Sequence, residues 1–172
     1  MNNIIRAERA TVKFCEGVEV DGYLLPDGEF RVGKVGAAIA VGYGKDWVGQ
    51  LKGKPLKALQ DKGFTGSEKP VQLNSINGGG TEAKTLSLLD FRKLIVFAAK
   101  KERPEAEALL DAIVDVSLED YFRIAFGQQT LTLEEKRDKF FKAYSATIDW
   151  LTEDRSDWEL IAEQELFLLS LN

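Results

Sequence analysis

Histidine is absent from the 172 residues, and cysteine occurs once, as Cys15. The missing histidine excludes catalytic triads and general bases built on imidazole, and it removes the commonest zinc ligand. A single cysteine excludes an intrachain disulfide and a cysteine metal cluster. Catalysis would have to use carboxylates, lysine or tyrosine, so we expect a protein that binds rather than an enzyme, with no cofactor.

Long apolar runs are also missing. No segment approaches the roughly 18 apolar residues that a membrane span requires. Met1 to Arg9 contains no apolar core of signal-peptide length. We therefore expect a cytoplasmic protein with no membrane partner. Cys15 follows Phe14 in a strand-like segment, which favours a buried small apolar residue over a reactive thiol.

The charges are unevenly distributed, although the formal net charge is only −5. Residues 1–103 carry 17 Lys and Arg against 12 Asp and Glu, whereas residues 104–172 carry 6 against 16. Within 31–69 the balance is 8 basic to 3 acidic. Such asymmetry is typical of a chain that binds a polyanion on one side. A lysine-rich face that only maintains solubility would give the same pattern.

The first part of the chain has the chemistry of strands and turns. Residues 10–16 and 17–24 combine Val, Phe and Tyr with partial alternation, which predicts two strands. Leu25 to Gly28 is a turn signal, because proline fixes φ and glycine accepts a positive φ. Residues 29–32 then predict a short returning strand. Residues 70–76 and 82–88 predict a second hairpin.

Short helices are expected between these hairpins. Val35 opens a small-residue helix that ends near Gly42, and one more helical turn is expected between Lys45 and Leu51. A further helix is expected to start at Pro55 and to end at Gly63. The glycine-rich loop around 77–81 lacks the lysine and hydroxyl residue of a P-loop, so we interpret it as a hairpin tip.

The rest of the chain is predicted to be helical. Amphipathic patterns predict helices over 89–101 and 104–127. The capping box of Thr132 and Glu135 opens a helix over 133–152, and a last helix is expected over 156–171. The fold class is therefore α+β, with N-terminal β-hairpins and short helices followed by a helical C-terminal part. We expect an α+β domain over 1–128 and a helical hairpin extension over 129–172.

Basic residues of the first part are the candidate binding residues. Lys and Arg add salt-dependent affinity when they contact phosphates. Tyr43 and Trp47 are interleaved with Lys45 and Lys52, which suits nucleic-acid contact if the rings are exposed and core packing if they are buried. Lys and Arg also cluster from Arg92 to Arg103. The predicted nucleic-acid-binding set is Arg31, Lys34, Lys45, Lys52, Lys54, Lys57, Arg92 and Lys93.

The acidic C-terminal part allows other interpretations. It could bind another protein, as an inhibitor or adaptor, or it could cover the basic part of its own chain. Asp111 and Asp115 share a helix face, but a solvated acidic face explains them better than a metal site, because no other ligand pattern accompanies them. The apolar segment 166–171 predicts either intramolecular packing or an oligomer interface, so a protein partner or a homodimer through 130–172 is possible.

Four short segments, in this order, resemble the Bro-N/KilA-N class of phage antirepressor-type domains. They are DGEF at 27–30, GYGKDW at 42–47, TLSLLDFRKLI at 85–95 and RPEAEALLDAIVD at 103–115. The similarity covers about residues 10–127, and its most specific pieces are the GY step and the PEA element. The tryptophan that follows the PEA element in that class is absent here.

The resemblance implies a function. Domains of this class bind DNA, so it implies double-stranded DNA as the partner of residues 1–128 and a regulatory role of the phage antirepressor type. The C-terminal helices would then form a partner-binding or dimerising module. The competing hypothesis is an acidic inhibitor or adaptor, linked to phages, mobile elements or host defence, that acts through those helices.

Overall fold

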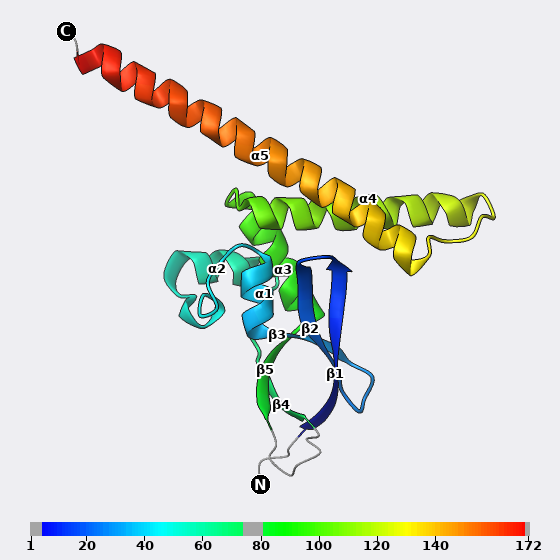
Figure 1. Ribbon diagram of the computed structural model, residues 1–172. Helices are drawn as coiled ribbons and strands as arrows, with labels where there is room; N and C mark the ends of the chain where they lie inside the picture. Colours follow the sequence, from blue (N-terminus) through cyan, green and yellow to red (C-terminus); the bar gives the residue numbers. More distant parts are fainter. Residues whose placement is uncertain (1–4, 74–80, 171–172) are drawn as a thin grey trace.

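A computed structural model describes the backbone of residues 5–73 and 81–170 and the side chains of the same segments up to residue 152. The fold is α+β, as predicted, with the strands in the first half and the long helices after them. Figure 1 shows a small barrel at one end, short helices and α3 beside it, and two long helices that cross beyond it.

The five strands close into a barrel in the order β1-β2-β3-β5-β4. The strands are β1 (Ile5–Cys15), β2 (Val18–Leu24), β3 (Phe30–Gly33), β4 (Lys69–Leu73) and β5 (Glu82–Ser87). The predicted hairpins β1-β2 and β4-β5 are both present and antiparallel. The closure was not predicted: β1 pairs with β4 in parallel, and β3 pairs with β5.

Three short helical elements connect β3 to β4. They are α1 (Lys34–Ala40), the 3₁₀ turn η1 (Val48–Gln50) and α2 (Gly53–Asp61). Gly42 and Gly63 follow α1 and α2 with φ of +88° and +96°, values that L side chains rarely adopt. The two glycines therefore end these helices as the sequence predicts.

The long helices are α3 (Leu88–Lys100), α4 (Pro104–Ala125) and α5 (Leu133–Ser170). The Asp90 backbone N–H donates to the Ser87 hydroxyl, which caps α3. The capping box before α5 is confirmed, because the Glu135 N–H donates to the Thr132 hydroxyl and the Thr132 N–H donates to the Glu135 carboxylate. The start of each long helix thus follows from local sequence.

The predicted helical hairpin over 129–172 is wrong, because α5 is one continuous helix. The sequence predicts one helix that ends at residue 152 and another that starts at 156, where Ser156 and Asp157 can cap a helix. Ser and Asp within a helix cost only about a few tenths of a kcal/mol each relative to better helix formers. Residues 133–170 contain no glycine or proline that would end the helix. Without a breaker, the helix continues.

The first part of α5 belongs to the main core. Phe140 is buried, and its ring stacks on Phe14 of β1 at 5.4 Å between centroids. It shares one apolar cluster with Cys15, Leu94 and Leu109. The predicted boundary at 128/129 lies in the loop between α4 and α5, but α5 packs on both α4 and β1 beyond it.

Cys15 is buried, as predicted, and burial raises the pKa of its thiol. The glycine-rich loop 77–81 lies almost wholly outside the described residues, as do the side chains of the apolar segment 166–171. Within the described residues, none of the helices combines the length and the apolar character needed to cross a bilayer.

Candidate functional site

A groove of about 400 Å³ lies between α2 and α3. Its floor is apolar, formed by Ala58 and Leu59 of α2 and by Val96 and Phe97 of α3. Its other lining residues are all basic: Lys62, Arg92, Lys93, Lys100 and Lys101. No carboxylate lines it, so the groove combines an apolar floor with positive walls.

The carboxylates nearest to these basic residues in the sequence are Asp61, before Lys62, and Glu102, after Lys101, and neither of the two lines the groove. Glu102 lines the adjoining hollow together with Lys101 and Arg103. Lys62, Arg92, Lys100 and Lys101 are exposed, and Lys93 is half-buried. Like charges held this close create a positive potential that a polyanion lowers by binding.

An aromatic column adjoins the groove. The rings of Tyr43 and Trp47 stack with centroids 3.8 Å apart, and Phe97 follows 6.3 Å from Trp47. Cations cover both ends, because the Arg103 guanidinium lies 4.3 Å from the Tyr43 ring and the Lys101 ammonium 5.7 Å from the Phe97 ring. Phe97 and Lys101 also line the groove, so the column extends the same basic surface.

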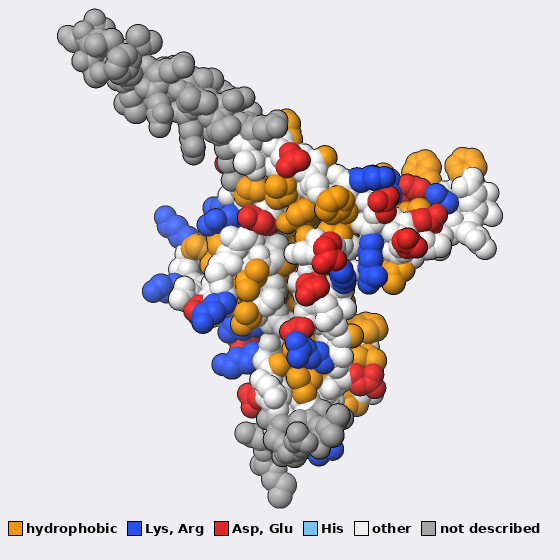
Figure 2. All heavy atoms as spheres, viewed as in Figure 1, with side chains coloured by type: hydrophobic (Ala, Val, Ile, Leu, Met, Phe, Trp, Pro, Cys, Tyr) orange, Lys and Arg blue, Asp and Glu red, His pale blue; other side chains and the backbone are white. Residues whose placement is uncertain are grey.

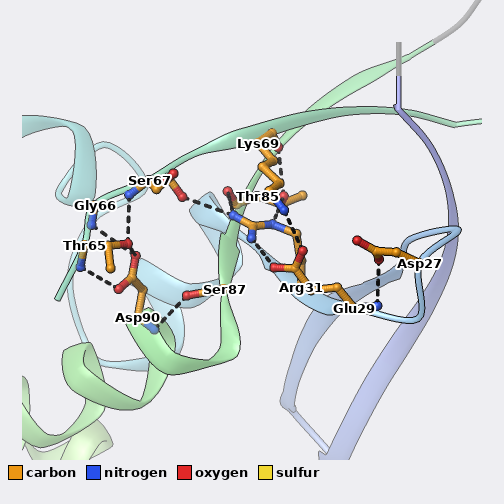
Figure 3. Close-up of polar contacts among 10 residues, drawn as sticks. All are labelled: Asp27, Glu29, Arg31, Thr65, Gly66, Ser67, Lys69, Thr85, Ser87 and Asp90. Carbon is orange, nitrogen blue, oxygen red and sulfur yellow. Dashed lines mark hydrogen bonds and ion pairs between the residues drawn. The ribbon is translucent and has the colours of Figure 1, made fainter. Parts of the chain in front are cut away.

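Buried polar contacts fix the loop that joins α2 to β4, and thereby one wall of the groove (Figure 3). Asp90 of α3 is fully buried. Its carboxylate accepts hydrogen bonds from the Thr65 N–H at 2.8 Å, the Thr65 hydroxyl at 2.8 Å and the Gly66 N–H at 3.1 Å. Asp90, in the first turn of α3, thus anchors this loop, a structural role that the sequence alone did not indicate.

Arg31 does not belong to the candidate surface, contrary to its predicted role. Its side chain is only 3% exposed. The guanidinium donates to the Thr85 hydroxyl at 2.8 Å, to the carbonyls of Thr85 and Ser67 at 3.1 Å, and to the Glu29 carboxylate (Figure 3). Glu29 also pairs with Lys69. Arg31 therefore holds strands and a loop together, and phosphates cannot reach it.

Two other predicted residues lie among carboxylates. Lys34 is largely buried and pairs with Glu68. Lys45 lies in a different hollow, which Asp21, Asp46 and Glu82 also line. The positive charge of these two lysines is therefore offset locally, and neither joins the groove between α2 and α3.

Of the remaining predicted residues, two line the groove and three are exposed in or next to α2. Arg92 and Lys93 line it, and Lys52, Lys54 and Lys57 are exposed around α2. Figure 2 shows Lys and Arg side chains gathered over this part of the molecule. The predicted set omitted Lys62, Lys100, Lys101 and Arg103. The cluster from Arg92 to Arg103 was a visible signal for three of these four, whereas only the fold brings Lys62 beside them.

Three acidic residues in the second half of α4 form ion pairs with lysines of α5. Lys139 of α5 pairs with Asp115 at 3.1 Å and with Glu119 at 2.9 Å, and Lys136 pairs with Asp120 at 2.9 Å. Among the described residues, these carboxylates do not cover the groove. In the same part of the chain, no three Cys, Asp or Glu side chains are grouped so that they could hold a metal ion.

Comparisons of the chain with protein-family models, curated proteins and solved structures found no match. The resemblance to Bro-N/KilA-N domains therefore stays a prediction from the sequence segments.

Proposed function

We propose that this protein binds double-stranded DNA through the basic surface formed by α2 and α3, including the C-terminal end of α3. One observation carries the proposal: five basic side chains line a single groove without a carboxylate among them. Arg103 and the exposed lysines Lys52, Lys54 and Lys57 extend the positive surface on either side. Only a partner with several negative charges uses so many cations at once.

The chemistry of the groove suits the DNA backbone. Its four lysines and Arg92 can each contact a phosphate oxygen. Such contacts fix the position of the protein on DNA and carry no sequence information by themselves. Binding at this surface is therefore strongly salt-dependent and only weakly selective for sequence.

The regulatory part of the proposal rests on the resemblance. A chain similar to phage antirepressor-type domains would bind DNA with its first part and use its helices for a second contact. We propose this role as the context of the DNA binding, and not as a separate activity.

Binding of a labelled duplex, followed by fluorescence anisotropy at low salt, tests the proposal. The groove variant replaces three groove lysines by glutamine: Lys62→Gln, Lys100→Gln and Lys101→Gln. Each lost phosphate contact weakens non-specific binding, so we expect affinity to fall by more than tenfold. A single strand of the same length serves as a competitor and reports which form of DNA is preferred.

A matched variant controls for net charge. It replaces three lysines outside the groove: Lys13→Gln, Lys84→Gln and Lys142→Gln. Both variants lower the formal charge by the same amount, and in the control Lys13 and Lys142 also form ion pairs with Glu16 and Asp138. We expect the control to bind almost as well as the unmodified protein. Equal losses in both variants would show general attraction and contradict a defined site.

A second candidate function, protein binding through the helical part, has its own observation. Large apolar side chains at the end of α4 are exposed, among them Leu118, Tyr121 and Phe122. Exposed apolar surface of this kind is typical of interaction sites. Asp115, Glu119 and Asp120 of the acidic part are paired within the chain, and the apolar face beside them is a separate argument for a protein partner.

A further inference from the structure

The second half of α4 has an apolar face that is exposed in the part of the chain that the structure describes. Val114, Leu118, Tyr121, Phe122 and Ala125 recur at helical spacing, and all of them are exposed. Tyr121 and Phe122 are 73% and 65% exposed. Figure 2 shows hydrophobic side chains at the end of α4 that leads into the loop to α5.

The opposite face of the same helix packs against the core and forms ion pairs. Leu109 and Ala112 are buried in the main core, and Asp115, Glu119 and Asp120 pair with basic residues. At 3.6 residues per turn, Leu118 lies about half a turn away from this packed side. Packing among the described residues therefore does not account for the large apolar side chains of the exposed stripe.

The size of the stripe matches what a dimer interface needs. Tyr121 and Phe122 of the stripe, and Phe126 directly after α4, are each at least 65% exposed, and aromatic side chains bury about 150–250 Å² each. The area estimate counts Phe126 together with the stripe. With Val114 and Leu118, the face offers about 550 Å² of side-chain surface by this estimate. Two copies would bury about 1,100 Å², which clears the roughly 1,000 Å² expected of a specific interface.

The charges around the stripe favour a second copy over a basic partner. From Val114 to Ala125 every carboxylate is already paired: Asp115 and Glu119 with Lys139, and Asp120 with Lys136. A basic protein would find no free carboxylate there, whereas an identical apolar stripe needs none. Two helices that present the same apolar face can pack about a twofold axis, in which each surface binds its own copy.

We propose that the protein forms a homodimer in which the α4 stripes of two copies, centred on Leu118, pack against each other. This interface differs from one through residues 130–172, because it lies on α4 and leaves α5 outside. It does not depend on DNA binding. A twofold dimer would also present two basic grooves, so each dimer could contact a duplex at two places.

The experiment measures molar mass by light scattering across a dilution series of the full chain. The test variant combines Leu118→Glu and Phe122→Glu, which place charges in the stripe without touching the core. The control variant, Ile39→Glu, changes a 56% exposed apolar residue on α1. We expect twice the 19.2 kDa chain mass for the unmodified protein and the control, and the single-chain mass for the test variant.

Two results would overturn the proposal. The unmodified protein could remain at the single-chain mass at the highest concentration, which rules out a second copy as the occupant. Alternatively, the test variant could dimerise as strongly as the unmodified protein, which would place the interface elsewhere on the chain. Circular dichroism tests whether the variant folds. Because the variant leaves the basic groove unchanged, its DNA binding is measured separately, so that a failure to dimerise is distinguished from a failure to bind DNA.

Discussion

Replacing Asp90 by asparagine tests whether the buried carboxylate holds the loop between α2 and β4. The side chain accepts three hydrogen bonds, at 2.8, 2.8 and 3.1 Å, all from Thr65 and Gly66. Asparagine has the same shape but turns one acceptor oxygen into an amide donor, which faces donors in the loop. At least one bond is then lost, and donors are left without partners in a buried place.

The magnitude follows from these contacts. A hydrogen bond to a charged group contributes about 1.5–3 kcal/mol, and an unsatisfied buried donor costs about 1–3 kcal/mol. We therefore expect Asp90→Asn to lower the free energy of unfolding by about 2–4 kcal/mol. For a chain of this size each kcal/mol corresponds to about 2–4 °C, so the melting temperature should fall by roughly 5–15 °C.

Urea unfolding followed by tryptophan fluorescence gives this free energy. Asp61→Asn, an exposed carboxylate of α2, is the matched control and should change stability by less than about 0.5 kcal/mol. Thr65→Val removes one of the three hydrogen bonds to Asp90 and the acceptor of the Ser67 N–H, and should cost about 1–2 kcal/mol. If Asp90→Asn were as stable as the unmodified protein, the carboxylate would not fix the loop, and our account of how α2 is positioned would be wrong.

The remaining predictions concern the core, a turn and the helical ion pairs. Phe140→Ala should lower unfolding free energy by about 3–5 kcal/mol in the same assay, because it empties a buried stacking site. Gly42→Ala should cost about 1–3 kcal/mol, since φ is +88° there. The pKa of the Glu119 carboxyl is lowered, chiefly by a hydrogen bond from Lys139. The stabilisation that Glu119 gives the folded state is therefore fully present above its unfolded pKa of about 4.3, and it is lost as the pH falls through the lower folded pKa. The melting temperature should therefore decrease as the pH is lowered into this range, and Lys139→Met should make that decrease smaller.

Local sequence signals predicted much of the fold. Signals that act within a few residues were the most informative. The structure has a turn at Leu25 to Gly28, a helix end at Gly63 and a helix start at the Thr132 capping box. The closure of the barrel depends instead on the parallel pairing of β1 with β4, which joins segments far apart in the chain. Periodicity carries no information about such partners.

The candidate site shows the same division. Arg92 and Lys93 were found because they are neighbours in a basic helix, and they do line the groove. Arg31 was misassigned because a charged side chain in sequence gives no sign of burial, and its partners Thr85 and Ser67 come from distant segments. Lys62 was missed for the converse reason: only tertiary packing of α2 against α3 brings it to the others.

The salt dependence of duplex binding tests the central claim most directly. Each phosphate contact contributes about 0.9 to the slope of log affinity against log salt, so five groove cations predict a slope of about −4 to −5. The variant with Lys62, Lys100 and Lys101 changed to glutamine should bind with a slope smaller by about 2.7, whereas the control with Lys13, Lys84 and Lys142 changed should keep the full slope. No detectable duplex binding at low salt, or an unchanged slope in the groove variant, would contradict the account.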